Sequence, residues 1–174
     1  MNYLAIFLLL PIIFFLPRES EARKRYLDLS DTLCEAGETV YISCSLDVVG
    51  STLDYSGPVA SVCAKGNTSP DAGYVQYRYG TPGVGVDVAF PEKKVPPRGL
   101  VKIYNHNTNL GASLRFHDGS HTYSFESAGL AGMKLVVKDR MGEMVNKWCD
   151  APGVTYITDS AYTGIEKNQS ETGP

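Results

Sequence analysis

Four cysteines and three histidines are the side chains of this sequence best suited to metal binding or covalent chemistry. None of the cysteines forms a Cys-x-x-Cys pair, which argues against a zinc ribbon or a thioredoxin-type redox site. An even number of cysteines in an exported chain indicates disulfides. Cys44 ends one expected strand and Cys63 lies in the next, so of the possible pairings we favour the local bridge Cys44–Cys63. Cys34–Cys149 would then join the ends of the domain.

Two of the histidines suggest a metal site at a turn. His117 and His121 lie on either side of an Asp-Gly pair. A two-residue Asp-Gly loop would pair His117 with Ser120 and Phe116 with His121. The two imidazoles would then point to opposite faces of the sheet and could not bind one ion. We therefore expect neither a metal nor a cofactor.

Motifs for catalysis are absent from the sequence. It contains no Gly-x-Ser-x-Gly, and its glycine-rich stretches lack the strand–turn–helix context of a phosphate-binding loop. A glycoside hydrolase with paired carboxylates remains an alternative, because the separation of two carboxylates in space cannot be read from a sequence. We favour a protein without enzymatic activity, and an envelope hydrolase acting on glycans is the alternative.

Aromatic and basic side chains suggest a binding surface. In the segment Tyr74–Tyr79, strand alternation places Tyr74, Gln76 and Arg78 on one side and the other residues on the core side. A polar, aromatic side with a guanidinium suits contacts with protein or glycan. The basic loop Glu92–Arg98 is pre-ordered by two consecutive prolines, although such a loop can also be a rigid linker. The candidate binding residues are Tyr74, Gln76, Arg78, Lys93, Lys94, Arg98, Arg115 and His117.

Short strands must position these residues. Within Glu38–Leu46, apolar and polar residues alternate with a period of two, which is typical of a half-buried strand. No long window has helical spacing. The pattern predicts an all-β fold, an antiparallel β-sandwich or small β-barrel of about eight to nine strands with two disulfides. The further expected strands are Val59–Ala64, Tyr74–Tyr79, Val84–Phe90, Leu100–Tyr104, Ala112–His117, Ser120–Phe125, Met133–Lys138 and Met144–Cys149.

The N-terminus resembles a secretory signal. The apolar run Leu4–Leu16 is shorter than the about 20 residues that a membrane-spanning helix needs, and a small-x-small cleavage pattern follows at Ser20–Ala22. An uncleaved short anchor is the alternative. We expect residues 1–22 to be a signal peptide, 23–33 a leader, 34–149 the β domain and 150–174 a flexible C-terminal tail. The mature chain would be periplasmic or secreted, without a membrane span.

Composition narrows the classes of partner. The chain has 174 residues, a formal net charge of −3 and 43% apolar residues. The length suits one domain, and the charge gives no basic field of the kind that nucleic acid binding needs. The chain is too apolar for a disordered protein and too polar for a membrane bundle. We therefore expect no nucleic acid partner.

A set of segments between Cys34 and Cys149 is recognisable: ETVYISCSL, SVCA, GYVQYRYG, VAFP and LRFHDGSHTYSFE. With the four cysteines, this set resembles a group of small exported proteins of Gram-negative bacteria. The resemblance implies a periplasmic or secreted β domain, and it brings no activity and no catalytic residues. A looser similarity links the chain to periplasmic lysozyme inhibitors, which are also small, exported and antiparallel β. Those inhibitors commonly use a Ser-Gly-x-x-Tyr type loop, which this sequence lacks.

Together these observations predict an exported protein that binds another macromolecule, most concretely a protein partner in the envelope or the medium. One version is an inhibitor or immunity-type partner of a cell-wall-degrading enzyme. The alternatives are the envelope hydrolase and a structural or adhesin-like component. The sequence leaves the partner's identity and the oligomeric state open.

Overall fold

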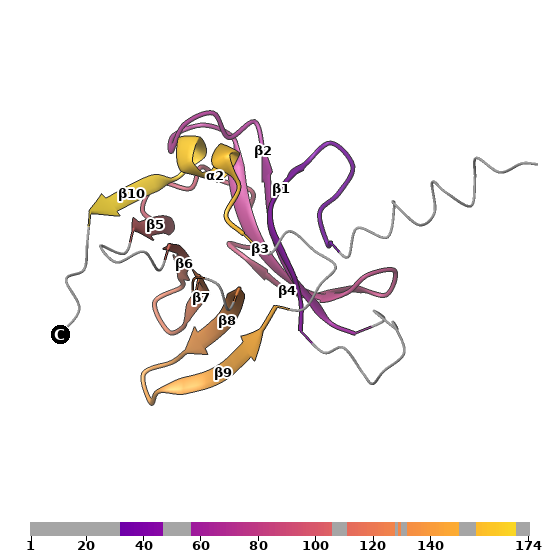
Figure 1. Cartoon of the computed structure of the whole chain (residues 1–174). Helices are drawn as coiled ribbons and strands as arrows, with labels where there is room; N and C mark the ends of the chain where they lie inside the picture. Colours follow the sequence, from indigo (N-terminus) through magenta and orange to yellow (C-terminus); the bar gives the residue numbers. More distant parts are fainter. Residues whose placement is uncertain are drawn as a thin grey trace, which may run out of the picture.

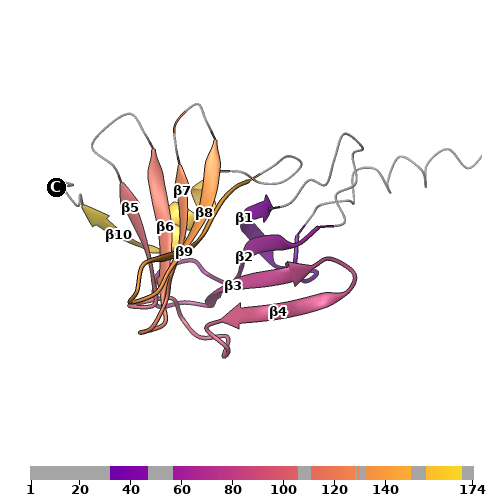
Figure 2. The same cartoon turned by 90° about the horizontal axis from the view of Figure 1, so that it is seen from below.

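The structure is a computed structural model that describes residues 32–46, 57–105, 111–127, 129, 132–149 and 156–169. The expected signal peptide, most of the expected leader and parts of the expected tail lie outside these ranges. Within them, strands form two sheets that pack face to face as a sandwich (Figure 1). In Figure 2 the strands of one sheet run steeply across those of the other.

Sheet A, the four-stranded sheet, has the order β1-β2-β3-β4, and all its pairings are antiparallel. Its strands are β1 (Thr39–Ser45), β2 (Val59–Lys65), β3 (Tyr74–Thr81) and β4 (Gly85–Phe90). Sheet B, the six-stranded sheet, has the order β10-β5-β6-β7-β8-β9. Its strands are β5 (Val101–Asn105), β6 (Ala112–His117), β7 (Thr122–Ser127), β8 (Met133–Lys138), β9 (Glu143–Trp148) and β10 (Glu166–Gln169). The all-β sandwich with two disulfides is confirmed.

Alternate residues of both sheets fill the core. Val62 of sheet A and Leu114, Phe116 and Phe125 of sheet B are fully buried between the layers. Burying one such side chain stabilises the fold by roughly 1.5–3 kcal/mol. The expected alternation fails at one point, because a bulge in β1 turns Tyr41 into the core.

The disulfides join different partners from those expected. The bonds are Cys34–Cys63 and Cys44–Cys149, so the prediction of Cys44–Cys63 and Cys34–Cys149 was wrong. Cys44 pairs with Ala60 across the ladder and belongs to the core, whereas Cys63 lies three residues further along β2 and faces the other side of sheet A. Side chains on opposite faces of a sheet cannot form a disulfide.

The turn between β6 and β7 also differs from the prediction. His117 pairs with Thr122 and Phe116 with Tyr123, so the loop has four residues rather than two. The Asp118 carboxylate accepts hydrogen bonds from the backbone N–H groups of Ser120 and His121, which closes an Asx-type turn. His117 lies on the outer face of sheet B because Phe116 beside it faces the core, and His121 belongs to the loop instead of to β7.

The C-terminal segment is part of the fold. Residues 156–169 form a short helix, α2 (Asp159–Gly164), and β10, which pairs in parallel with β5. Ile157, Ala161 and Ile165 are buried in the core. For these residues the expected flexible tail was wrong, because a helix of six residues and a strand of four are too short to show a periodicity. Leu33, from the expected leader, also hydrogen-bonds to Ser61 of β2.

Gly73 makes the turn into β3 possible and gives a first testable prediction. Its φ is +62°, and a Cβ there would lie 2.1 Å from the Lys65 carbonyl oxygen. Gly73→Ala should therefore lower the free energy of unfolding by more than about 2 kcal/mol, measured by denaturant titration. Gly83→Ala is the matched control, since its φ is +78° but no atom lies within 4 Å of an added Cβ. Equal losses in both variants would contradict the close approach at Gly73.

Candidate functional site

Several of the expected binding residues gather on the outer face of sheet A, around Glu38. Tyr74, Gln76 and Arg78 share this face, as the alternation predicts. The expectation that Gln76 and Arg78 are exposed was wrong, because only 4% and 3% of them is accessible. Residues 32–38 and the loop after β4 cover this part of the sheet.

Arg78 is fully engaged within the protein. Its guanidinium donates two hydrogen bonds of 2.7 Å to the Glu38 carboxylate, one of 2.8 Å to the Leu33 carbonyl and one of 2.9 Å to Gln76. The Glu38 side chain is 1% exposed and also accepts a hydrogen bond from the Tyr74 hydroxyl. The cluster is a buried ion pair that fixes residues 32–38 to sheet A.

The basic loop Glu92–Arg98 is likewise paired within the chain. Lys94 donates to Glu35 at 3.0 Å and lies over the Tyr74 ring. Arg98 bonds to Asp71 and to Glu166. Two of the cations that made this loop a candidate for an acidic partner thus already contact carboxylates.

The remaining expected residues lie apart from this cluster. Lys93 is exposed in the loop after β4. Arg115 stacks on Tyr104, 4.5 Å from its ring centroid, and His117 contacts the Thr122 hydroxyl at 3.1 Å. Both lie on the outer face of sheet B, so the expected residues do not form a single site.

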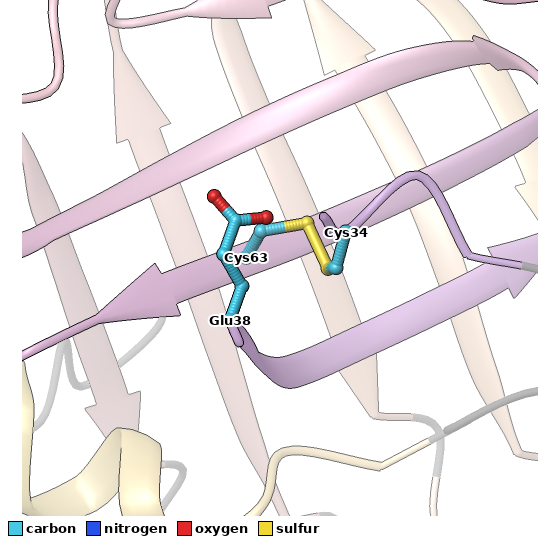
Figure 3. A group of neighbouring side chains, drawn as sticks. All are labelled: Cys34, Glu38 and Cys63. Carbon is cyan, nitrogen blue, oxygen red and sulfur yellow. A yellow bond between two sulfur atoms is a disulfide. The ribbon is translucent and has the colours of Figure 1, made fainter. Parts of the chain in front are cut away.

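One group of possible metal ligands is present among the described residues, formed by Cys34, Glu38 and Cys63. Their donor atoms lie within 4.8 Å of one another (Figure 3). The two sulfur atoms are bonded to each other, so neither offers the thiolate that a metal needs. The Glu38 carboxylate already forms an ion pair with the Arg78 guanidinium. In the oxidised chain this group therefore fixes residues 32–38 to sheet A.

A pocket of about 330 Å³ opens between the two sheets, away from this cluster. Tyr77 and Tyr123 meet across the sandwich with ring centroids 4.8 Å apart. Aliphatic and thioether side chains make up most of the remaining wall. The lining residues are Leu46, Tyr77, Tyr79, Val88, His121, Tyr123, Leu135, Val137, Met144, Val145 and Lys147.

Two β-bulges shape the walls of this pocket. One interrupts the β3–β4 pairing next to Tyr79, and the other interrupts the β8–β9 pairing next to Val137. A bulge bends its strand and increases the local twist, and bulges are frequent beside binding sites. Here β4 and β9, one edge strand of each sheet, border the same opening.

Polar groups lie at a few points of the lining. The Tyr123 hydroxyl donates to Asp118 at 3.4 Å, and His121 lies 3.5 Å from the same carboxylate. Burial acts to raise the pKa of Asp118, but hydrogen bonds from His121 and Ser120 outweigh it and lower the pKa to about 2. Burial raises the pKa of Tyr77. Burial and the nearby Asp118 carboxylate raise the pKa of Tyr123, so both tyrosines keep neutral hydroxyl groups at ordinary pH.

Exposed apolar side chains flank the opening. Val88 of β4 and Met144 of β9 both line the pocket, and they are 39% and 58% exposed. Soluble proteins usually keep their edge strands polar, and clustered apolar side chains mark interaction sites.

This pocket was not predicted from the sequence. Strand alternation places Tyr77 and Tyr79 on the core side of β3, but it carries no information on where two sheets separate. One signal was available in the expected strand Met144–Cys149. Alternation there puts Lys147 on the same face as Val145 and Cys149, so a lysine points between the sheets.

Comparison with known proteins returned no matching family model, no matching curated protein and no matching solved structure. In the part of the chain that the structure describes, none of the helices could span a bilayer. The two disulfides indicate an oxidising, extracytoplasmic environment.

Proposed function

We propose that this chain is an exported binding protein that holds an apolar ligand in the pocket between sheets A and B. The observation that carries the proposal is the mostly apolar pocket of about 330 Å³, bordered by the exposed apolar side chains Val88 of β4 and Met144 of β9. A concave apolar pocket with a few polar groups is the usual form of a small-molecule site.

Tyr77 and Tyr123 form the aromatic floor of the pocket, and the packing around these two rings holds the floor in place without a ligand. Tyr77 and Tyr123 pack on each other and on Phe116, Phe125 and Phe90 behind them, with ring centroids 4.8–6.4 Å apart. Aromatic pairs of this kind stabilise a core beyond their buried area. A pre-formed floor lowers the conformational cost of binding.

Two features support an exported location for this function. The apolar run Leu4–Leu16 with its cleavage pattern predicts a signal peptide, and both disulfides fit an oxidising compartment. We propose that the mature protein is periplasmic or secreted and there meets apolar molecules that are poorly soluble in water.

Filling the pocket tests the proposal. The fluorescent probe N-phenyl-1-naphthylamine should bind to the wild-type protein with increased emission. Val145 lines the pocket, and Val145→Trp should weaken binding of the probe at least about tenfold because the indole occupies the space. Asn146 is the next residue of β9 and faces outward, so Asn146→Trp should bind the probe as the wild type does.

Circular dichroism and thermal unfolding establish that each variant is folded. Val88→Trp fills the pocket from β4 and keeps the test decisive if Val145→Trp does not fold. Probe binding that is unchanged in a folded pocket-filling variant would contradict the proposed site. A wild-type protein that does not bind the probe would contradict the proposed function.

The protein partner expected from the sequence stays a prediction. The structure offers it less support than the pocket, because Arg78, Lys94 and Arg98 are engaged within the chain. The glycan hydrolase alternative needs paired carboxylates. Among the described residues, those that line this pocket include no Asp or Glu. A pull-down from envelope extracts whose partner is lost in Lys93→Ala, but not in Val145→Trp, would favour the protein partner.

A further inference from the structure

We propose that the ligand of this pocket is a planar aromatic compound with a neutral carbonyl group, and that the Tyr77 hydroxyl donates a hydrogen bond to that carbonyl. This inference rests on the proposed function and concerns the chemical class of the ligand. It starts from three tyrosines of the lining, Tyr77, Tyr79 and Tyr123, which bring both ring surfaces and hydroxyl groups to the same pocket.

Tyr77 carries a buried hydroxyl without a hydrogen bond to any described residue. The residue is only 2% accessible, and it lines the pocket. Its oxygen does not belong to the enclosed side-chain atoms that lack a hydrogen bond, so it is accessible from the space that Tyr77 lines. A buried donor without a partner costs free energy, and a ligand that accepts a hydrogen bond from it removes that cost.

The other two hydroxyl groups differ from that of Tyr77. The Tyr123 hydroxyl donates to the Asp118 carboxylate at 3.4 Å, so its proton is directed away from a ligand. Tyr79 is only partly buried, so water can reach it. Burial, followed by repulsion from Tyr123 and Tyr79, raises the pKa of Tyr77, so its hydroxyl keeps its proton at ordinary pH. Tyr77 is therefore the donor that a buried acceptor would meet.

A neutral hydroxyl at this depth favours a neutral acceptor. Moving an ion away from water costs far more than moving a carbonyl group, unless an opposite charge and hydrogen bonds compensate. A carbonyl oxygen accepts hydrogen bonds and carries no proton, so it can bond to Tyr77 without needing an acceptor of its own.

The rings of the lining favour a flat ring system over an alkyl chain. Tyr77 and Tyr79 of β3 face Tyr123 of β7, and the His121 ring centroid lies 6.1 Å from that of Tyr123. Aromatic rings prefer offset-stacked or edge-to-face contacts, which add to the gain from buried area. Met144 adds a thioether, which also contacts aromatic rings favourably. A pocket of about 330 Å³ is near the lower end of the range for small molecules and suits two fused rings.

Water in the pocket is a second explanation for the open hydroxyl of Tyr77, and the two explanations predict different results. If water is its only partner, Tyr77→Phe should leave the affinity for a carbonyl compound unchanged. If a ligand carbonyl accepts from it, only carbonyl compounds should lose affinity. Without ligand, Tyr77→Phe should unfold at about the temperature of the wild type. A clearly lower unfolding temperature would contradict a hydroxyl without a partner inside the protein.

Three compounds test the inference: 2-acetonaphthone, 2-ethylnaphthalene, which has the same outline without the carbonyl oxygen, and 2-nonanone, which is an aliphatic ketone. Displacement of N-phenyl-1-naphthylamine from the wild type should show tighter binding of 2-acetonaphthone than of 2-nonanone. In Tyr77→Phe, 2-acetonaphthone should bind about fivefold more weakly and 2-ethylnaphthalene equally well. Tyr162→Phe is the matched control, since it removes a tyrosine hydroxyl outside the lining and should change neither affinity.

The inference is overturned if 2-nonanone binds as tightly as 2-acetonaphthone, or if Tyr77→Phe leaves the affinity for 2-acetonaphthone unchanged. An equal loss for 2-acetonaphthone and 2-ethylnaphthalene would also overturn it, because the variant would then act on the shape of the pocket and not on a hydrogen bond. The proposed function survives all of these results. Absence of binding by the probe and by all three compounds would instead contradict the proposed function itself.

Discussion

Replacing Cys44 and Cys149 together by alanine is expected to lower the free energy of unfolding by about 5 kcal/mol. This bond closes a loop with a sequence separation of 105 residues, so its loss releases a large part of the unfolded chain. It also joins β1 of sheet A to the residue that follows β9 of sheet B. Denaturant titration followed by tryptophan fluorescence measures the change, since Trp148 is the residue before Cys149.

The second disulfide is the matched control. Cys34–Cys63 spans 29 residues, so the double alanine variant of this pair should lose about 3.5 kcal/mol. Only loss of Cys44–Cys149 should also weaken binding of the probe, because Leu46 and Lys147 line the pocket on either side of that bond. A larger loss of stability from the Cys34–Cys63 pair would contradict this account of the two bonds.

Glu38→Ala is expected to lower the free energy of unfolding by about 3–5 kcal/mol. The variant leaves the Arg78 guanidinium, whose side chain is 3% exposed, without the carboxylate that accepts two of its hydrogen bonds. Replacing both partners, as in Glu38→Leu with Arg78→Leu, should recover part of the loss because no buried charge remains. Arg98→Met removes the exposed ion pairs with Asp71 and Glu166 and should lower the free energy of unfolding far less than Glu38→Ala does, because water screens exposed charges.

The dependence of stability on pH gives a second measurement of the Glu38 cluster. Burial acts to raise the pKa of Glu38, but hydrogen bonds from Arg78 and Tyr74 outweigh it, so the pKa lies below its ordinary value of 4.5. A lowered pKa in the folded state stabilises the protein above the unfolded pKa, and this stabilisation is lost as the pH falls through the folded pKa. Glu38→Gln should therefore flatten the curve of unfolding free energy below about pH 4.5. An unchanged slope would contradict a strong Glu38–Arg78 ion pair.

The strands could be predicted from the sequence because their signal is local. Period-two alternation, strand-forming composition and turn signals together predicted a strand at the position of each of β1 to β9, including β3 with Val75 and Tyr77 inside and Arg78 outside. Features that depend on distant contacts were missed. The disulfide pairing depends on the β1–β2 register. The position of residues 156–169 depends on the parallel pairing of β10 with β5, which is distant in the sequence.

The burial of Gln76 and Arg78 also depends on distant contacts that local sequence patterns do not reveal. Alternation tells which face of a strand a side chain takes, but not what covers that face. Gln76 and Arg78 lie on the outer face as predicted, and residues 32–38 cover them through Leu33 and Glu38. The pocket also depends on tertiary structure and could not be predicted from local patterns. It forms where the two sheets cross and where the bulges in the β3–β4 and β8–β9 pairings bend β4 and β9.

Methyl chemical shifts during a titration with 2-acetonaphthone test the central claim most directly. If the pocket between the sheets is the binding site, the methyl groups of Val88, Val137 and Val145 should shift in a saturable way. Val136 belongs to the same strand as Val137 but points to the outer face of sheet B, and its methyl groups should stay unchanged. Shifts confined to Val136 and its neighbours on the outer face, or no saturable shift at all, would contradict the account.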